Sequence, residues 1–193
     1  MAFAGSEESF PTAMKILVAG GFGVGKTTMV HTVSEISALS TEEMLTEAGL
    51  GVDDLDGVED KKTTTVALDF GRITINPELV VYLFGTPGQD RFWFMWDELA
   101  NGALGAVVIV DTRRMESSFP SIDFFEHRGI PFVGAVNPFA DSHRYTTSEI
   151  RTALDLDEAT PVVDCDARER PGTKLVLSAL LETVLNAATT ASS

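Results

Sequence analysis

The sequence predicts an α/β fold, with helices on both faces of a six-stranded, mostly parallel sheet. Two observations lead to this prediction. Short continuous apolar runs, typical of buried parallel strands, alternate along the chain with segments of helical periodicity. A glycine-rich loop also joins the first apolar run to the first helical segment. Sheets of this kind bind ligands at the carboxyl ends of their strands, so we expect the site there.

Six segments favour strands. Residues 14–21 (MKILVAGG), 103–111 (ALGAVVIVD) and 130–136 (IPFVGAV) are almost wholly apolar and favour central strands, and 160–165 (TPVVDC) favours a shorter one. Residues 63–76 and 79–85 are rich in β-branched and apolar side chains and are separated by a turn at NPE. We expect these last two to pair antiparallel.

Five segments favour helices. The first begins near Lys26, where apolar residues recur at helical spacing. Residues 91–100, 118–129 and 145–156 follow, and Thr147 or Ser148 is expected to cap the last of these. The final helix is expected to begin near Pro171, a residue tolerated in a first helical turn.

Length and composition indicate one domain. The chain has 193 residues, and we expect a domain from 13 to 188 between a flexible N-terminus (1–12) and a flexible C-terminal tail (189–193). The net charge of −15 argues against nucleic acid, whose phosphates would be repelled. No apolar run is long enough to insert into a membrane, and no secretory signal is recognisable, so a cytoplasmic location is expected.

Acidic residues are concentrated between Ser40 and Asp60, where there is no Lys or Arg. Such a segment is typical of a solvated, mobile loop. An alternative interpretation is a docking surface for a basic partner.

The loop from Gly20 to Thr27 matches the pattern G-x-x-x-x-G-K-[ST] between a strand and a helix. Its glycines allow consecutive backbone N–H groups to turn towards a phosphate, and the helix N-terminus adds partial positive charge. Lys26 is expected to bridge the β- and γ-phosphates, and the Thr27 hydroxyl to contact Mg²⁺. The nucleotide-binding residues expected here are Gly20, Gly21, Phe22, Gly23, Val24, Gly25, Lys26, Thr27 and Thr28.

Six motifs between residues 14 and 185 together resemble a Ras-like small GTPase: GGFGVGKTT, KKTTTVALDFGRI, LFGTPGQDRFWFMW, VVIVDTRR, AVNPF and CDAR. The bacterial gliding-motility type and the actinobacterial conservon type are more similar still. The resemblance implies a P-loop NTPase with a Ras-like three-layer domain. It also implies a GTP/GDP molecular switch, a GTPase with slow, partner-stimulated hydrolysis.

In the resembled family, a threonine ahead of the second strand completes the Mg²⁺ shell and senses the γ-phosphate. Thr65 is the matching position, and Thr63 and Thr64 are the alternatives. Gliding-type members carry an arginine just before this threonine, where Thr64 stands here. The resemblance therefore implies slow intrinsic hydrolysis.

The second switch resembles the pattern D-x-x-G-Q, with Gly88 and Gln89 at its last two positions. The resemblance implies that Gly88 donates its N–H to the γ-phosphate and that Gln89 orients the attacking water; with Lys26 they form the expected catalytic set. Gly85 departs from the pattern, since a carboxylate ordinarily stands there. Both bacterial types lack it, and we expect weaker Mg²⁺ affinity as a result.

The base-binding motif N-K-x-D is matched only in part. Asn137 matches, but Pro138 replaces the lysine, Ala140 stands at the aspartate position and Asp141 comes one residue late. Ala167, in CDAR, matches the alanine whose N–H contacts the guanine carbonyl oxygen. The preference for guanine over adenine therefore stays open.

The aromatic run RFWFMW cannot be buried on one helix face, so part of it is expected to be exposed. Trp93 or Trp96 could anchor a partner, the alternative being that most of the run packs beneath the second switch. The resemblance implies a roadblock-fold regulator and a membrane-associated sensor, through which the protein could be recruited to a membrane.

Two other function classes compete with the switch. One is a nucleotide-binding regulatory module with little turnover or relaxed GTP/ATP specificity, which Gly85 and Ala140 favour. The other is a P-loop metabolite kinase, against which stands the lack of an arginine-rich lid in the sequence.

Overall fold

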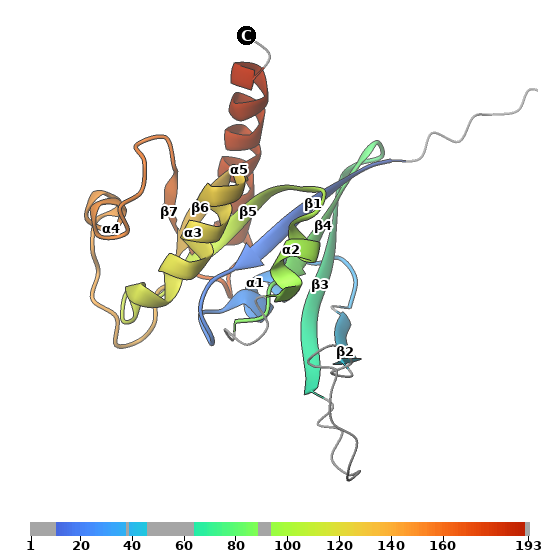
Figure 1. Cartoon of the computed structure of the whole chain (residues 1–193), viewed down its shortest axis with the longest axis horizontal. Helices are drawn as coiled ribbons and strands as arrows, with labels where there is room; N and C mark the ends of the chain where they lie inside the picture. The colour runs from blue at the N-terminus through green and yellow to red at the C-terminus, as the bar shows by residue number, and fades with distance from the viewer. Residues whose placement is uncertain (1–10, 38, 46–63, 89–93, 192–193) are drawn as a thin grey trace, which may run out of the picture.

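The computed structural model describes residues 11–37, 39–45, 64–88 and 94–191 (Figure 1). The strands are β1 (Thr12–Ala19), β2 (Leu39–Leu45), β3 (Thr64–Asn76), β4 (Leu79–Gly85), β5 (Ala103–Val110), β6 (Phe132–Val136) and β7 (Val162–Asp164). The helices are α1 (Lys26–Val33), α2 (Phe94–Ala100), the short 3₁₀ helix η2 (Met115–Ser118), α3 (Phe119–Arg128), α4 (Thr147–Ala153) and α5 (Arg170–Ala191).

One sheet joins all the described strands, in the order β2-β3-β4-β1-β5-β6-β7. Strand β1 lies near its centre, parallel to both β4 and β5, while β3 pairs antiparallel with β4 and with β2. After β1 the chain builds one half of the sheet, and from β5 onward it builds the other. The change of side at β1 is the position at which such sheets bind ligands.

Helices cover both faces of this sheet (Figure 1). Alternate residues of β1 point to opposite faces, as the pleat of a strand requires. Ile16 and Val18 join a core with α1 and α5 residues, whereas Leu17 and Ala19 join a second core with residues of α2, α3 and α4. The continuous apolar run of β1 is thus explained by burial on both sides.

The predicted α/β class with its mostly parallel sheet is confirmed, and the described residues form five α-helices. The sheet contains one strand more than expected. Residues 39–45, the start of the segment interpreted as a loop, form β2 on the edge beside β3. Backbone N–H and C=O groups of an edge strand can pair with a polar segment as well as with an apolar one, so acidic composition concealed this strand.

Two predicted boundaries also differ. The N-cap of α4 is Thr146 and neither of the expected caps, Thr147 or Ser148, because Thr146 and Glu149 form a reciprocal capping box. Helix α5 continues to Ala191 and thus passes the expected domain boundary at 188.

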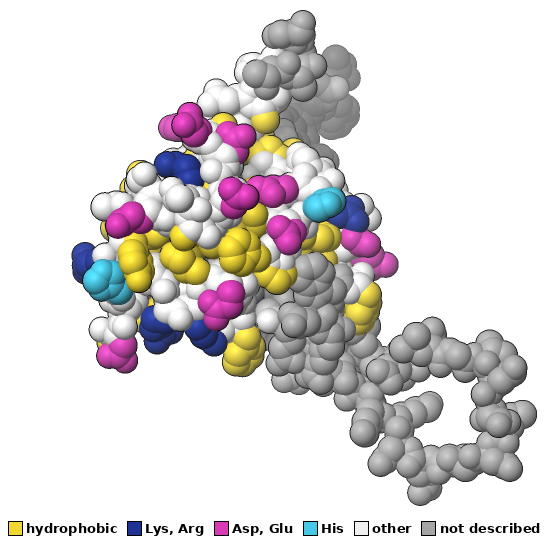
Figure 2. Space-filling view, turned by 60° about the vertical axis from the view of Figure 1, so that its left-hand side comes forward, with side chains coloured by type: hydrophobic (Ala, Val, Ile, Leu, Met, Phe, Trp, Pro, Cys, Tyr) yellow, Lys and Arg dark blue, Asp and Glu magenta, His cyan; other side chains and the backbone are white. Residues whose placement is uncertain are grey.

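The described surface carries acidic and hydrophobic side chains in proximity. Figure 2 shows a band of hydrophobic side chains across one face with acidic groups beside it. The acidic groups on this face agree with the net charge of −15. Within the described residues, no helix combines the length and apolar character needed to cross a membrane.

Candidate nucleotide-binding site

The loop between β1 and α1 has a backbone that only glycine adopts readily. Gly20, Gly23 and Gly25 have φ angles of +130°, +74° and +110°. At Gly20 an added Cβ atom would also lie 2.5 Å from the Ile109 carbonyl oxygen of β5. Gly25 directly precedes α1, so the unpaired N–H groups of the first helical turn open next to this loop. The loop geometry therefore suits phosphate binding, as the sequence predicted.

Lys26 lies inside the loop. Its Nζ donates to the carbonyl oxygens of Gly20 at 2.9 Å and Gly21 at 2.7 Å, and the residue is only 9% exposed. Burial lowers the pKa of Lys26 to about 8, and the negative charge of Asp69 partly opposes this shift. A cation buried in a cradle of backbone groups is suited to bind a polyanion.

Asp69 of β3 stands beside Thr27 at the first turn of α1. The Thr27 hydroxyl donates to Asp69 Oδ2 at 2.6 Å. An added Cβ atom at Gly85 would lie 3.0 Å from the same Oδ2, so the Asp69 side chain occupies the space that a larger residue at 85 would need. The neighbouring strand therefore places a carboxylate beside both Gly85 and Thr27.

The placement of Asp69 beside Thr27 and Gly85 was not predicted from the sequence. The available signal was a single carboxylate within the otherwise apolar stretch VALDFGRI, on a strand expected to pair with the one that ends at Gly85. In the described part of the chain, no group of three His, Cys, Asp or Glu side chains could hold a metal. One hydroxyl and one carboxylate nevertheless fit Mg²⁺, because this ion prefers oxygen ligands and keeps several waters.

Gly88 brings the second switch against the phosphate loop. An added Cβ atom there would lie 2.6 Å from Lys26 Nζ and 3.1 Å from the Gly21 carbonyl oxygen. The loop after β4 is held against β1 by Thr86, whose N–H donates to the Val18 carbonyl oxygen at 2.8 Å. A larger residue at 88 would press on the Lys26 ammonium group and crowd the Gly21 carbonyl, so the Gly88 backbone lies close to the expected phosphate position.

Two predicted residues lie partly or wholly beyond what the structure describes. Gln89 lies outside the described residues. The backbone of Thr65 pairs with Met44 in the β2–β3 ladder, but its side chain is not described. Their expected roles at the attacking water and the metal stay predictions.

Asn137 follows β6 and connects two loops. Its Nδ2 donates to the Val24 carbonyl at 2.9 Å, and its Oδ1 accepts from the Ala167 N–H at 3.0 Å. Asn137 is 6% exposed, so both bonds are made in a buried place. The Ala167 N–H, expected to contact a base, is thus donated to Asn137 in this structure.

A pocket of about 400 Å³ opens beside these residues. It is lined by Gly23, Gly25, Thr28, Arg113, Asn137, Pro138, Phe139, Ala140, Ala167 and Arg168. These residues come from the carboxyl ends of β1, β5, β6 and β7 and from α1. Asp141, the late carboxylate of the partial motif, is exposed and is not among the lining residues.

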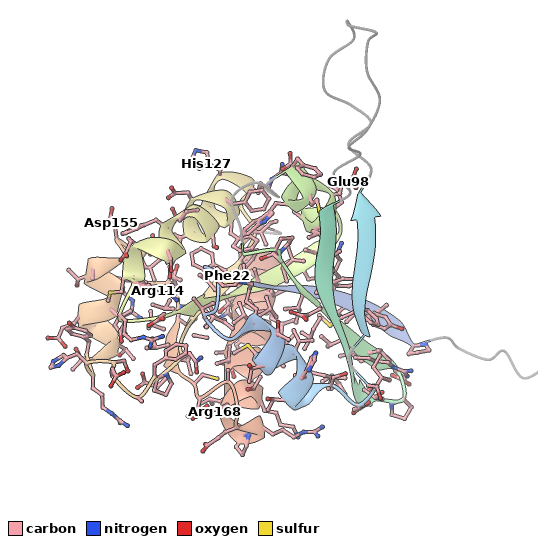
Figure 3. The ribbon with its side chains drawn as sticks, turned by 90° about the horizontal axis from the view of Figure 1, so that it is seen from below. Phe22, Glu98, Arg114, His127, Asp155 and Arg168 are labelled. Atoms are coloured by element: carbon pink, nitrogen blue, oxygen red, sulfur yellow. The ribbon has the colours of Figure 1, made fainter. Side chains whose placement is uncertain are left out.

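Asp111 follows β5, is fully buried and holds two arginines. Its carboxylate accepts from Arg113 Nε at 2.9 Å and Nη2 at 2.8 Å, and these bonds lower the pKa of Asp111. Arg114 reaches the Phe22 carbonyl oxygen at 3.2 Å. Phe22, Arg114 and Arg168, labelled in Figure 3, come from three loops at this edge of the sheet. The motif VVIVDTRR contains Asp111, Arg113 and Arg114, but their pairing was not predicted from it.

Comparison with known proteins assigns this chain to a family. The family described as "Conserved hypothetical ATP binding protein" matches residues 18–187. The chain belongs to this family. A relative, an uncharacterised protein of Methanocaldococcus jannaschii, is 30% identical over 139 residues, which cover 71% of this chain and 77% of the relative.

Solved structures similar to this chain include a G domain and a cytosolic domain of FeoB proteins. The FeoB G domain from Methanococcus jannaschii has a TM-score of 0.59 at 16% identity, covering 90% of this chain and 98% of that one. The cytosolic domain of the T. maritima FeoB iron transporter has a TM-score of 0.63 at 17% identity, covering 90% of this chain and 64% of that one. This chain therefore spans about two thirds of that cytosolic domain. At these identities the likeness concerns the fold alone.

The aromatic run RFWFMW contains both a buried and an exposed residue. Trp96 is 2% exposed and packs against Phe124 and Phe125, so it belongs to the core and offers no partner anchor. Phe94 is 64% exposed, which agrees with the expectation that part of the run is accessible. Trp93 lies outside the described residues.

Proposed function

We propose that this protein binds GTP together with Mg²⁺, hydrolyses it slowly, and acts as a molecular switch. The observation that carries the proposal is the meeting of Lys26, the Thr27–Asp69 pair and Gly88 at one point beside the phosphate loop. A cation, an oxygen-rich pair and a close backbone from a following loop are what a terminal phosphate requires to be bound and sensed.

Each residue of this group has a distinct proposed role. Lys26 places its charge against the β- and γ-phosphates, leaving the Gly20 and Gly21 carbonyls that it contacts in this structure. The Gly88 N–H donates to the γ-phosphate, so the loop after β4 responds to its presence or loss. Gln89 is proposed to orient the attacking water, as in the resembled family.

Thr27 and Asp69 would hold Mg²⁺ from the protein side, and Thr65 is proposed as the third group. The Thr27 hydroxyl already points at the Asp69 carboxylate, so both oxygens are oriented by the fold. When bound, magnesium neutralises phosphate charge. Asp69 would orient the water ligands of the metal, because β3 places its carboxylate beside Gly85, which has no side chain.

Turnover is proposed to be slow without a partner. Thr64 stands where gliding-type members carry an arginine, so no charge is supplied from that position. A roadblock-fold regulator and a membrane-associated sensor remain the proposed partners, with the protein in the cytoplasm. An acidic protein of net charge −15 is a poor candidate for binding nucleic acid.

A second candidate is a regulatory module with relaxed GTP/ATP specificity and little turnover. It is favoured by Ala140 in the pocket wall and by Asp141 outside it, which leave no carboxylate from this loop to read the guanine edge. The description of the matching family as ATP binding points in the same direction. A metabolite kinase receives no comparable support.

One titration separates these functions. GTP, GDP and ATP affinities are measured by calorimetry with and without Mg²⁺, and phosphate release is then followed over hours. The switch predicts tight GTP and GDP binding with slow phosphate release. Equal ATP binding without turnover would favour the module. Lys26→Met should abolish binding, whereas Lys174→Met, at an exposed position of α5, should not. Retained affinity in Lys26→Met would contradict the proposal.

A further inference from the structure

The guanidinium group of Arg113 is fixed in the wall of the 400 Å³ pocket. Two of its nitrogens, Nε and Nη2, donate to the two oxygens of the buried Asp111 carboxylate. The Arg113 backbone N–H also donates to Asp111, at 3.0 Å. An arginine held by two parallel bonds has lost most of its rotational freedom, so its plane has a defined orientation before any ligand arrives.

Phe139 supports this plane. The Arg113 Cζ atom lies 3.9 Å from the centroid of the Phe139 ring, a distance typical of stacking between a guanidinium and an aromatic ring. The Arg113 side chain nevertheless remains 35% exposed and lines the pocket. The part of the guanidinium not covered by Phe139 or occupied by Asp111 therefore faces the pocket.

The position of the pocket suits the base of a nucleotide. Gly25 and Thr28, at the start of α1, line it together with Asn137 and Ala167. A ligand whose phosphates rest on the loop from Gly20 to Thr27 would extend its base into this space. Pro138 stands at the lysine position of the partly matched motif N-K-x-D, so no lysine side chain enters the pocket from there.

We propose that Arg113, backed by Phe139 and oriented by Asp111, is the planar surface on which the purine base of the nucleotide stacks. The proposal rests on the proposed function, since it assumes a nucleotide on the phosphate loop. A planar, weakly hydrated guanidinium stacks on flat π systems, which an ammonium group does not. Stacking engages the face of the base and not its hydrogen-bonding edge. Arg113 therefore favours purines over pyrimidines and treats guanine and adenine alike.

The unmodified protein gives the first test. Affinities for GTP, ATP, UTP and inorganic tripolyphosphate are measured by calorimetry in the presence of Mg²⁺. We expect GTP and ATP to bind about tenfold or more tighter than UTP, because a purine offers the larger stacking face. UTP binding as tight as both purine nucleotides would overturn the proposal.

Substitution gives the second test. Arg113→Ala should weaken GTP and ATP by the same factor, about tenfold, and leave tripolyphosphate affinity within about twofold. Arg113→Lys, which keeps the charge but not the plane, should lose nearly as much. Phe139→Leu, which leaves the Asp111 pair in place, should lose less. If Arg113→Lys binds GTP normally, or if GTP and ATP respond differently, the base is not stacked on this group.

Arg128→Ala is the matched control. Arg128 also combines a carboxylate, Asp97, with an aromatic ring, that of Phe124 at 4.9 Å, but it lies on α3 away from the pocket. It should leave all four affinities unchanged. If wild-type protein binds neither nucleotide nor tripolyphosphate, the proposed function fails. If it binds both and Arg113→Ala is silent, only the stacking surface fails.

Discussion

The Thr27 hydroxyl donates a hydrogen bond to Asp69 across 2.6 Å, joining the first turn of α1 to the middle of β3. Gly85, on the neighbouring strand β4, makes room for this pair, since an added Cβ atom would lie 3.0 Å from Asp69 Oδ2. A carboxylate from a different strand thus lies beside Gly85. The absence of an acidic side chain at 85 is therefore compatible with a working metal site.

Asp69→Asn is expected to weaken Mg²⁺-dependent nucleotide binding by about tenfold or more, because an amide orients metal-bound water less well than a carboxylate. Magnesium titrations at fixed GDP, followed by calorimetry, measure this effect. Asp123→Asn, an exposed position on α3, is the matched control. An unchanged Mg²⁺ dependence in Asp69→Asn would remove this residue from the metal site.

Gly85→Asp is expected to destabilise the protein, since it places a second carboxylate against Asp69, whose Oδ2 atom would lie only 3.0 Å from the new Cβ atom. Combining it with Asp69→Ala should recover stability and part of the Mg²⁺ dependence. Urea unfolding of both single variants and the double variant forms a thermodynamic cycle. Simple additivity of the two single effects would show that the side chains do not compete for this space.

Lys26→Met is expected to stabilise the nucleotide-free protein by up to about 3 kcal/mol at pH 7, although it abolishes binding. The pKa of Lys26 falls from 10.5 to about 8 on folding, so keeping the lysine charged in the fold costs free energy below pH 8. Between about pH 8 and 10.5 the unfolded chain holds a proton that the folded chain has released, and the unfolding free energy of the wild type rises with pH.

The difference between wild type and Lys26→Met should accordingly shrink across that window. Thermal unfolding at a series of pH values from 7 to 10 measures it, with Lys174→Met as the exposed control. A difference that stays constant with pH would mean that Lys26 does not titrate with a lowered pKa.

Asn137→Ala is expected to lower the unfolding free energy by about 2 to 4 kcal/mol, because the Val24 carbonyl and the Ala167 N–H would both lose their buried partner. Nucleotide affinity should fall as well, since the loops around the pocket lose their connection. Asn101→Ala, at an exposed position after α2, should change neither quantity. Chemical denaturation and calorimetry provide the two measurements, and a loss of affinity without a loss of stability would assign Asn137 to ligand contact alone.

Local pattern was sufficient for most of the fold. The apolar runs of β1, β5 and β6 and the glycine loop ahead of Lys26 are each explained by a nearby cause, burial on both faces or a left-handed backbone. Strand β2 was missed because its pairing depends on the open edge of β3 and not on its own composition. The Thr146 cap was missed by one residue although its partner Glu149 stood at the required spacing.

By itself, the sequence predicted every described strand except β2, the succession of helices along the chain, and the phosphate loop with Lys26 and Thr27. The tertiary structure alone decided which side chains complete the site. Asp69 meets Thr27 across 42 positions of sequence, and Arg113 reaches the pocket beside Asn137 from another strand end. The physical reason is that these contacts depend on strand order and register, which arise when both faces of one sheet are buried together and are not encoded in any local stretch.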